Sequence, residues 1–420
     1  MSSKLIVLLV FISAYLLFIF LPRRRMLTAL LAAIFLLCVR AIAPQEAFLA
    51  INWNVMGIFV GMLAVADIFM ESRVPAHMAE VIVDRARNTG WAILFICLMT
   101  GFISAFVENV ATVLIVAPIA ISLARKLKIS PVNMMIAIAV SSNLQGTATL
   151  IGDPPSMLLG GFAKMNFWDF FFYHGKPSIF FAVELGALVS FFVLYWIFKK
   201  EKEKIKLIPV EKIKSFFPTW LLVTLILLLA ASSFVPFEGA AGALCMLFGV
   251  VALSWKRLVL KSPFFKEIRK LDWDTTLFLA AVFILVGSLS LSGWITTFAS
   301  FLASLVGGNI LFGYITLVAV SVVLSAFIDN VPFLMAMLPV AMILADKLQV
   351  NPSLLLFGLL IGTSLGGNIT PIGASANIVA CGILKEEGYE VSFGEFARIG
   401  LPFTLVAVTA ASIFVWLIWR

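Results

Sequence analysis

Long apolar runs, separated by short polar segments, follow one another along almost the whole chain of 420 residues. Runs such as 5–21 and 178–198 are close to the ~20 residues that an α-helix needs to cross ~30 Å of hydrocarbon. We therefore predict an all-α polytopic membrane protein, with no segment left over for a soluble domain.

The runs occur twice in the same order, which indicates an internal repeat. The first half contains runs at 5–21, 26–43, 53–70, a paired segment 91–124, an interrupted segment 131–163, and 178–198. The second half contains 218–236, 239–254, 274–291, a paired segment 309–345, an interrupted segment 353–384, and 400–419. The sequence SAFVENV at 104–110 returns as SAFIDNV at 325–331, and the copies align without a gap as far as Lys164 and Lys385.

Charge predicts how the paired segments lie in the membrane. Arg85 and Arg87 precede the first pair and Arg125-Lys126 follow it. Basic flanks face the cytoplasm, so each pair must return to its starting side as a re-entrant hairpin. Each half then has about five transmembrane helices, a hairpin and one broken helix. An odd number of crossings makes the halves inverted repeats, which we place at 1–198 and 218–420 with a cytoplasmic basic linker at 199–217.

The basic clusters also predict the orientation of the chain. They include Arg23 to Arg25, Arg125 to Lys128, and Lys256 to Lys270, and they leave both termini outside if every cluster is cytoplasmic. The first run ends in Pro22-Arg-Arg-Arg without a small-residue cleavage pattern, so we expect it to be retained. We expect a multi-pass protein of the cell (inner or plasma) membrane.

Composition narrows the function. Hydrophobic residues make up 62% and charged residues 12% of the chain, against about 25% charged in ordinary globular domains. The net charge of +8 is explained by topology, so no nucleic-acid partner is expected. The four cysteines lack disulfide or zinc spacing; only Cys381 lies near a helix break. No GxxxxGK[ST] loop is present, so we expect no ATPase activity in this chain.

The interrupted segments contain the strongest candidate chemistry. GTATLIGDPP at 146–155 and GNITPIGASA at 367–376 break two apolar helices at matching positions. Non-helical backbone at membrane depth is tolerated only inside protein or beside water, and paired breaks are the best pointer to a transporter's central site. Free amides, carbonyls and half-helix dipoles can bind ions there. Simple Gly-Pro kinks remain the alternative.

Each hairpin tip carries an acid and an amide, Glu108-Asn109 and Asp329-Asn330. An acid at this depth is a functional hypothesis by default, although both carboxylates could instead cap the helices that follow. Asp153 lies inside the first break, where its repeat counterpart is Ala374. Asp67 lies near the end of its span, and Glu184 has no repeat partner, so it pairs with a neighbour or relays protons.

At these residues the chain resembles the ion transporter superfamily, in the branch of arsenite permeases, P-protein-type permeases and NhaD-like antiporters, with a citrate transporter-like domain. The resemblance lies in NLQGTATLIGDPPSMLLGG at 143–161 and in the first hairpin, and it covers nearly the whole chain. It implies a homodimer that moves a small inorganic or organic ion by an elevator mechanism. The half-sites it implies contain Glu108, Asn109, Thr112, Asn143, Gly146, Thr147, Thr149, Gly152 and Asp153 in the first half, and Asp329, Asn330, Gly366, Gly367, Asn368, Thr370, Gly373, Ser375 and Asn377 in the second.

One departure from the family pattern bears on the substrate. Dicarboxylate symporters carry a neutral Ser-Asn-Thr at the tips, whereas this chain carries Glu108 and Asp329. Carboxylates repel a dianion at low dielectric. We therefore expect a secondary active permease for arsenite or another inorganic ion, or a cation/proton antiporter, with Na⁺ or H⁺ as coupling ion and no other cofactor. A sodium-coupled citrate or dicarboxylate symporter is the alternative, and an intramembrane enzyme or an ion channel is less favoured.

Overall fold

The computed structural model describes residues 3–21, 24–127, 129–203, 212–235, 237 and 239–420. Arg23, Lys128 and part of the predicted linker (204–211) lie outside these residues. The first half contains α1 (Ser3–Phe20), α2 (Arg25–Cys38), α3 (Pro44–Ala50), α4 (Trp53–Glu71), α5 (Val74–Asp84), α6 (Thr89–Ser104), α7 (Asn109–Leu127), α8 (Val132–Gly146), α9 (Pro154–Phe162), a 3₁₀ turn (Trp168–Phe170), β1 (Phe172–Tyr173), β2 (Lys176–Pro177) and α10 (Ile179–Phe198). The second half contains α11 (Phe217–Ser232), α12 (Ala240–Val259), α13 (Phe264–Lys270), α14 (Trp273–Leu291), α15 (Trp294–Val306), α16 (Ile310–Ser325), α17 (Asn330–Lys347), α18 (Pro352–Gly366), a 3₁₀ turn (Gly367–Ile369), α19 (Ser375–Glu386) and α20 (Phe393–Trp419).

Within the described residues, nine helices are long and apolar enough to cross a membrane. They are α1, α4, α7, α10, α12, α14, α17, α18 and α20. Five shorter apolar helices accompany them. This confirms the predicted all-α polytopic class, to which the structure adds the two-residue antiparallel strands β1 and β2 and the short helices α3 and α13, which the apolar pattern does not predict.

Helices of the two halves begin in the same way. Asn88 and Asn309 occupy equivalent repeat positions and cap α6 and α16 through bonds to the amides of Trp91 and Phe312. Asn52 and Asp272 cap α4 and α14 in the same manner. Such a side-chain oxygen satisfies an amide that the first helical turn leaves free. The helix starts are therefore specified locally, and they recur at a nearly constant spacing.

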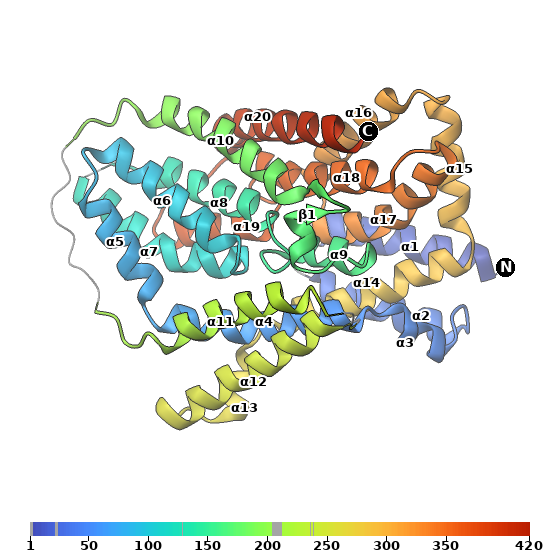
Figure 1. The fold of residues 1–420 in the computed structure, drawn as a ribbon, viewed down its shortest axis with the longest axis horizontal. Helices are drawn as coiled ribbons and strands as arrows, with labels where there is room; N and C mark the ends of the chain where they lie inside the picture. Colours follow the sequence, from blue (N-terminus) through green and yellow to red (C-terminus); the bar gives the residue numbers. More distant parts are fainter. Residues whose placement is uncertain (1–2, 22–23, 128, 204–211, 236, 238) are drawn as a thin grey trace.

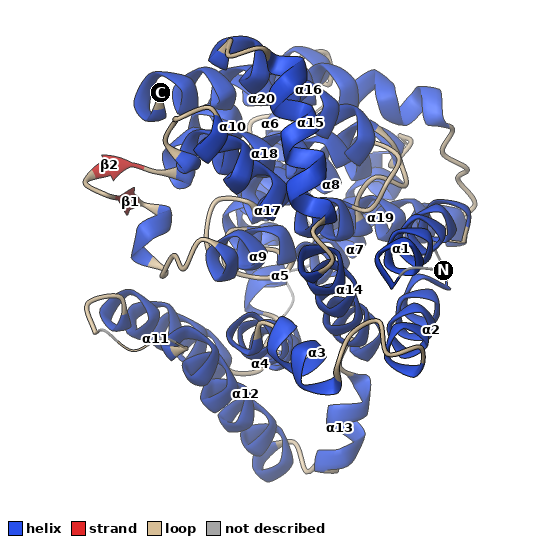
Figure 2. Ribbon diagram, turned by 90° about the vertical axis from the view of Figure 1, so that its right-hand side faces the viewer, coloured by secondary structure: helices blue, strands red, loops and turns tan. Residues whose placement is uncertain are grey.

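Helices of the first half pack against helices of the second half. α4 of the first half packs along α12 of the second, while α14 of the second packs against α2 of the first. Figures 1 and 2 show α4, α11 and α12 as a layer beneath the body that contains α6–α10 and α16–α20. A Cβ on Gly57 would lie 3.1 Å from the backbone of Gly242, whose amide donates to Asn54 Oδ1 at 2.8 Å. Small residues allow such close approach of helices in membranes.

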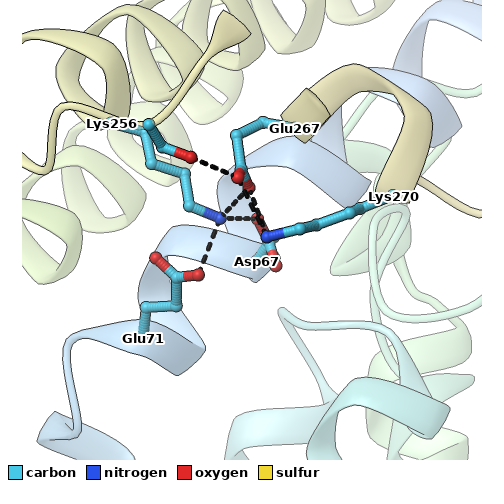
Figure 3. Close-up of polar contacts among 6 residues, drawn as sticks. Asp67, Glu71, Lys256, Glu267 and Lys270 are labelled. Carbon is cyan, nitrogen blue, oxygen red and sulfur yellow. Dashed lines mark hydrogen bonds and ion pairs between the residues drawn. The ribbon is translucent and has the colours of Figure 1, made fainter. Parts of the chain in front are cut away.

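A buried lysine fastens the ends of α4, α12 and α13 together (Figure 3). Lys256 Nζ, on a side chain that is 2% exposed, lies 2.7 Å from both Asp67 Oδ2 and Glu71 Oε1 and 2.5 Å from Glu267 Oε2. Burial raises the pKa of Glu267, but hydrogen bonds from Lys256, Ser262 and Lys270 outweigh it and bring that pKa down to about 2. Asp67, near the end of α4, therefore has a basic partner.

Replacing Lys256 with methionine should lower the thermal unfolding midpoint of the purified protein clearly. Breaking a buried ion pair by removing one partner costs about 3–5 kcal/mol, and here three carboxylates whose ligand atoms lie within 4.8 Å of one another would lose their shared cation. Lys270→Met is the matched control, because Lys270 also contacts Glu267 but is 50% exposed. The depressed pKa of Glu267 means that its ion pairs contribute fully above pH ~4.5 and weaken only as pH falls toward 2. An equal effect of both variants at neutral pH would contradict this account.

The corresponding helices α5 and α15 lie at opposite ends of the longest axis (Figure 1). This arrangement is compatible with inverted insertion, although the hairpins, the repeat boundaries and the termini outside the cell stay predictions. Asp84 and Ser304, which end or nearly end these helices, are both exposed.

In a cysteine-free background, we expect a cysteine at Ser304 to react with an impermeant thiol reagent added outside intact cells. A cysteine at Asp84 should react only after permeabilisation, because inverted halves place corresponding helices on opposite sides of the membrane. Labelling of both from the same side would exclude the inverted arrangement.

Candidate functional site

Both predicted helix breaks are present, and each is bonded to the tip of its own half. α8 ends at Gly146 and α9 begins at Pro154, while α18 ends at Gly366 and α19 begins at Ser375. Thr149 Oγ1 donates to the carbonyl of Ala105, and Thr370 Oγ1 donates to the carbonyl of Ala326. Both alanines follow the first helix of a predicted hairpin. The same hydroxyl thus joins break and tip in each half.

Gly152 and Gly373 allow the backbone of each break to approach neighbouring carbonyl oxygens closely. A Cβ on Gly373 would stand 2.5 Å from the carbonyl oxygen of Gly367 and 3.0 Å from that of Ala326. A Cβ on Gly152 would meet the carbonyl oxygens of Gly146 and, at 3.0 Å, Ala105. Real Cβ atoms do not come this close to backbone oxygen, so any side chain would force the break away from the tip.

In each break, a polar side chain donates hydrogen bonds to the backbone carbonyls of the same break. Asn377 Nδ2 donates to the carbonyls of Gly367 and Thr370, both at 2.9 Å. At the equivalent place in the first half, Ser156 Oγ donates to the carbonyl of Thr147 at 3.2 Å. These bonds satisfy carbonyls that the helix ends leave free, which matters because an unpaired polar group in an apolar interior costs several kcal/mol.

Asparagines from both halves join the two breaks into one buried network. Asn143 Nδ2 donates to Asn368 Oδ1 and to Asn377 Oδ1, both at 2.8 Å. Asn143 Oδ1 accepts from Asn109 Nδ2 at 3.4 Å, and Asn109 Oδ1 accepts from Ser104 Oγ at 2.6 Å. The four asparagines are at most 8% exposed. The network therefore uses both amide hydrogens of Asn143 to connect one half of the chain with the other.

Two carboxylates stand at the edge of this network. Asp153, 1% exposed, accepts from the amide of Ser156 at 3.1 Å and lies near the side chain of Asn109. Glu108 Oε2 accepts from the amide of Ala111 at 3.0 Å and lies close enough to Asp153 for the two charges to repel each other. The capping role considered for the tip acid is thus present in Glu108.

The second tip acid has a different partner. Asp329 Oδ1 accepts from the amide of Val331 at 3.0 Å, whereas Oδ2 pairs with Arg25 of α2. The charge pattern groups Arg25 with the cytoplasmic basic residues; instead its side chain, 25% exposed, lies against the tip. The two tips are therefore chemically unequal.

Comparison with known proteins identifies the family. The family model described as "Citrate transporter" matches residues 15–362 and 246–420. The chain belongs to this citrate transporter family. It is a membrane transporter.

Individual relatives agree with this family assignment. An uncharacterized transporter of Mycobacterium tuberculosis is 30% identical over 97% of both chains. The P protein of Mus musculus is 27% identical over 94% of this chain, which corresponds to 58% of the P protein. Among solved structures, the YdaH transporter of Alcanivorax borkumensis superposes with a TM-score of 0.61 at 15% identity, over 89% of this chain and 86% of that one. The resemblance to the ion transporter superfamily is thereby confirmed, and the YdaH match supports the fold.

The remaining predicted residues of this family member lie around the network. Thr112 and Thr147 donate to backbone carbonyls of Glu108 and Asn143, and a Cβ on Gly366 would lie 2.7 Å from the backbone of Val322. Asn330 and Ser375 are half-buried at the starts of α17 and α19. Glu184 accepts from Gln145 at 3.2 Å rather than from a basic residue. Cys381 is partly buried in α19.

Arg25, Ser104 and Ser156 are site residues that the sequence analysis missed. Ser156 had a usable signal, since the gapless alignment that pairs Ser104 with Ser325 also pairs Ser156 with the predicted residue Asn377. Ser104 begins the repeated heptapeptide but carries no charge to attract notice. Arg25 was hidden in a basic cluster at a helix end, where positive charges normally report only topology.

The network predicts energetic coupling between the halves. Asn143→Ala would leave two buried oxygens without their donor, at about 1–3 kcal/mol each. Because Asn143 and Asn377 are in contact, the double variant Asn143→Ala/Asn377→Ala should depart from additivity by about 0.5–3 kcal/mol. Thermal unfolding of the single and double variants in detergent provides the measurement. Asn143→Ala combined with Asn351→Ala, which removes only the exposed cap of α18, is the control and should be additive. Additivity in both pairs would contradict a shared network.

Proposed function

We propose that this citrate transporter family member is an ion-gradient-coupled secondary active transporter, and that its coupling Na⁺ or H⁺ binds at the asparagine network beside Glu108 and Asp153. One observation carries the proposal. A buried network joins the broken helices of both halves, and two carboxylates stand at its edge. A site made by both halves is suited to opening first toward one side of the membrane and then toward the other.

The available ligands favour a hard cation or a proton. Carboxylate, amide and backbone carbonyl oxygens are the ligands that hard metal ions prefer, and all three types converge at the network. Among the described residues, Arg25 is the one basic side chain that forms an ion pair with any of the three carboxylates Glu108, Asp153 and Asp329, and it does so only with Asp329. Buried acids without enough positive charge are stabilised by binding a cation or a proton.

The preferred cargo is arsenite or another inorganic ion, or a cation exchanged for protons. At neutral pH arsenous acid is uncharged, so it would not be repelled by Glu108 and Asp153. The resemblance to the superfamily further suggests an elevator displacement within a homodimer. The chain has no phosphate-binding loop for ATP, so an ion gradient supplies the energy.

Citrate-type symport is the second candidate, because the family model is described as a citrate transporter. The negative charges of such a substrate would be repelled by the carboxylates unless cations accompanied it. A thermal-shift panel of the purified protein with sodium, arsenite, antimonite, citrate and succinate across pH separates the candidates, since a ligand that binds the native state raises its apparent stability. Stabilisation by citrate only together with a cation would favour this second candidate.

Neutralising the two network acids should abolish coupling. In proteoliposomes with an imposed pH gradient, Glu108→Gln and Asp153→Asn should each lower proton-coupled flux of Na⁺ or arsenite by about tenfold or more, equivalent to ~1.4 kcal/mol of lost ion-binding free energy. Assembly should be retained because both substitutions keep the shape of the side chain.

Glu395→Gln is the matched control for this test. Glu395 belongs to an exposed capping box at the start of α20, a role that glutamine can also fill. This variant should transport as the wild type does. Wild-type coupling in both Glu108→Gln and Asp153→Asn would refute the proposed role of the two acids.

A further inference from the structure

The second tip already holds a positive charge supplied by the protein itself. Asp329 uses both carboxylate oxygens, one as the cap of α17 and the other in the ion pair with Arg25. A guanidinium is not deprotonated in proteins, so this positive charge is permanent. A cation approaching Asp329 would meet an occupied ligand and a like charge.

Arg25 is held in place by a different part of the fold from the tip it contacts. Its Nη2 lies 3.4 Å from Thr275 Oγ1, and its guanidinium lies 5.1 Å from the centre of the Phe278 ring, both on α14. Thr275 Oγ1 in turn donates to Asp272 Oδ2 at 2.6 Å. Cation–π contact and the neighbouring hydroxyl keep the side chain oriented. Arg25 therefore belongs to the α2–α14 pair, while Asp329 belongs to the tip between α16 and α17.

A second hydrogen bond joins the N-terminal helices to the region of the second tip. Tyr15 of α1 donates its hydroxyl to the carbonyl of Pro332 at 2.6 Å, in the first turn of α17. The ring of Phe18 meets that of Phe278 edge-on at 5.3 Å. The tip and the start of α17 are thus bonded both to α1 and to Arg25 of α2.

The first tip lacks such a partner. Among the described residues, no basic side chain forms an ion pair with Glu108. The repeat alignment that pairs Trp53 with Trp273 places Cys245, which is buried and uncharged, at the position of Arg25. The other charged groups whose electrostatic effect reaches Arg25 are Asp272 and Asp274 of α14 and, most weakly, Glu108 of the first tip, all acidic.

We propose that Arg25 is a resident counter-ion that neutralises Asp329, so that only the Glu108 tip takes the coupling cation. This inference rests on the proposed function. Two equivalent acidic tips would each require a cation before the site could move through a region of low dielectric. With Arg25 paired to Asp329 as in this structure, the second tip is neutral without a bound cation. Arg25 is thus a positioning residue that limits the number of cations coupled to transport.

The test uses the purified full-length protein and the variants Arg25→Gln, Arg25→Lys and Arg25→Gln/Asp329→Asn. Thermal unfolding midpoints are measured against NaCl at constant ionic strength, with N-methylglucamine as the replacement cation, and against pH from 5 to 8. We expect Arg25→Gln to gain a second dependence on Na⁺ or on pH that the wild type lacks. Arg25→Lys and the double variant should follow the wild-type curves, because each keeps the tip neutral. A purely structural role of Arg25 would lower the midpoint without changing these dependences.

Each outcome decides the question. The proposal is overturned if Arg25→Gln shows only the wild-type dependence, or if the double variant keeps the additional one. If Arg25→Gln is too unstable to purify, recovery of folded protein in the double variant supports the proposal, and failure to recover it is evidence against. A further outcome is that the wild type responds to neither Na⁺ nor pH, whereas Arg25→Gln gains a response that the double variant Arg25→Gln/Asp329→Asn loses. That outcome refutes cation coupling at the Glu108 tip, but it supports the role of Arg25 as counter-ion of Asp329.

Discussion

The need to satisfy polar backbone groups away from water organises the centre of this protein. Each broken helix leaves backbone carbonyls free inside the protein, and polar side chains of the same half donate hydrogen bonds to them. Thr149 and Thr370 fasten the breaks to the tips, and Ser156 and Asn377 fasten them internally. Asn143 then joins the halves. The same groups that stabilise the irregular backbone are the oxygen ligands of a candidate ion site.

The two halves resemble each other in sequence but differ in the chemistry of their sites. The capping residues, threonine hydroxyls and close glycines recur at a nearly constant spacing. The charges do not: Asp153 corresponds to Ala374, and Arg25 corresponds to Cys245. Backbone geometry is retained because it has few solutions at membrane depth, whereas side chains that bind an ion are free to differ. An unequal pair of half-sites follows from a nearly equal pair of folds.

The sequence was sufficient for the long apolar helices and the two breaks, though not for α3 and α13, because each of the former depends on local chemistry. A membrane-length apolar run, an asparagine cap or a Gly-Pro break can be read without knowing what lies opposite. The ion pair of Arg25 with Asp329 spans 304 residues, and that of Lys256 with Asp67 spans 189; no local pattern marks either. The site residues Asn109, Asn143, Asn368 and Asn377 were predicted individually, but not that one amide would serve two of the others.

The packing of α4 and α14 against helices of the other half constrains how the chain can be made. Asn54 and the amide of Gly242 that it accepts from are 188 residues apart, so α4 enters the membrane long before its partner α12 has been synthesised. During that interval its polar side chains Asn54, Asp67 and Glu71 have none of the α12 groups that satisfy them in the finished protein. The order of synthesis therefore leaves these groups unpaired until α12 is made, and the first half alone lacks the helix against which α4 packs.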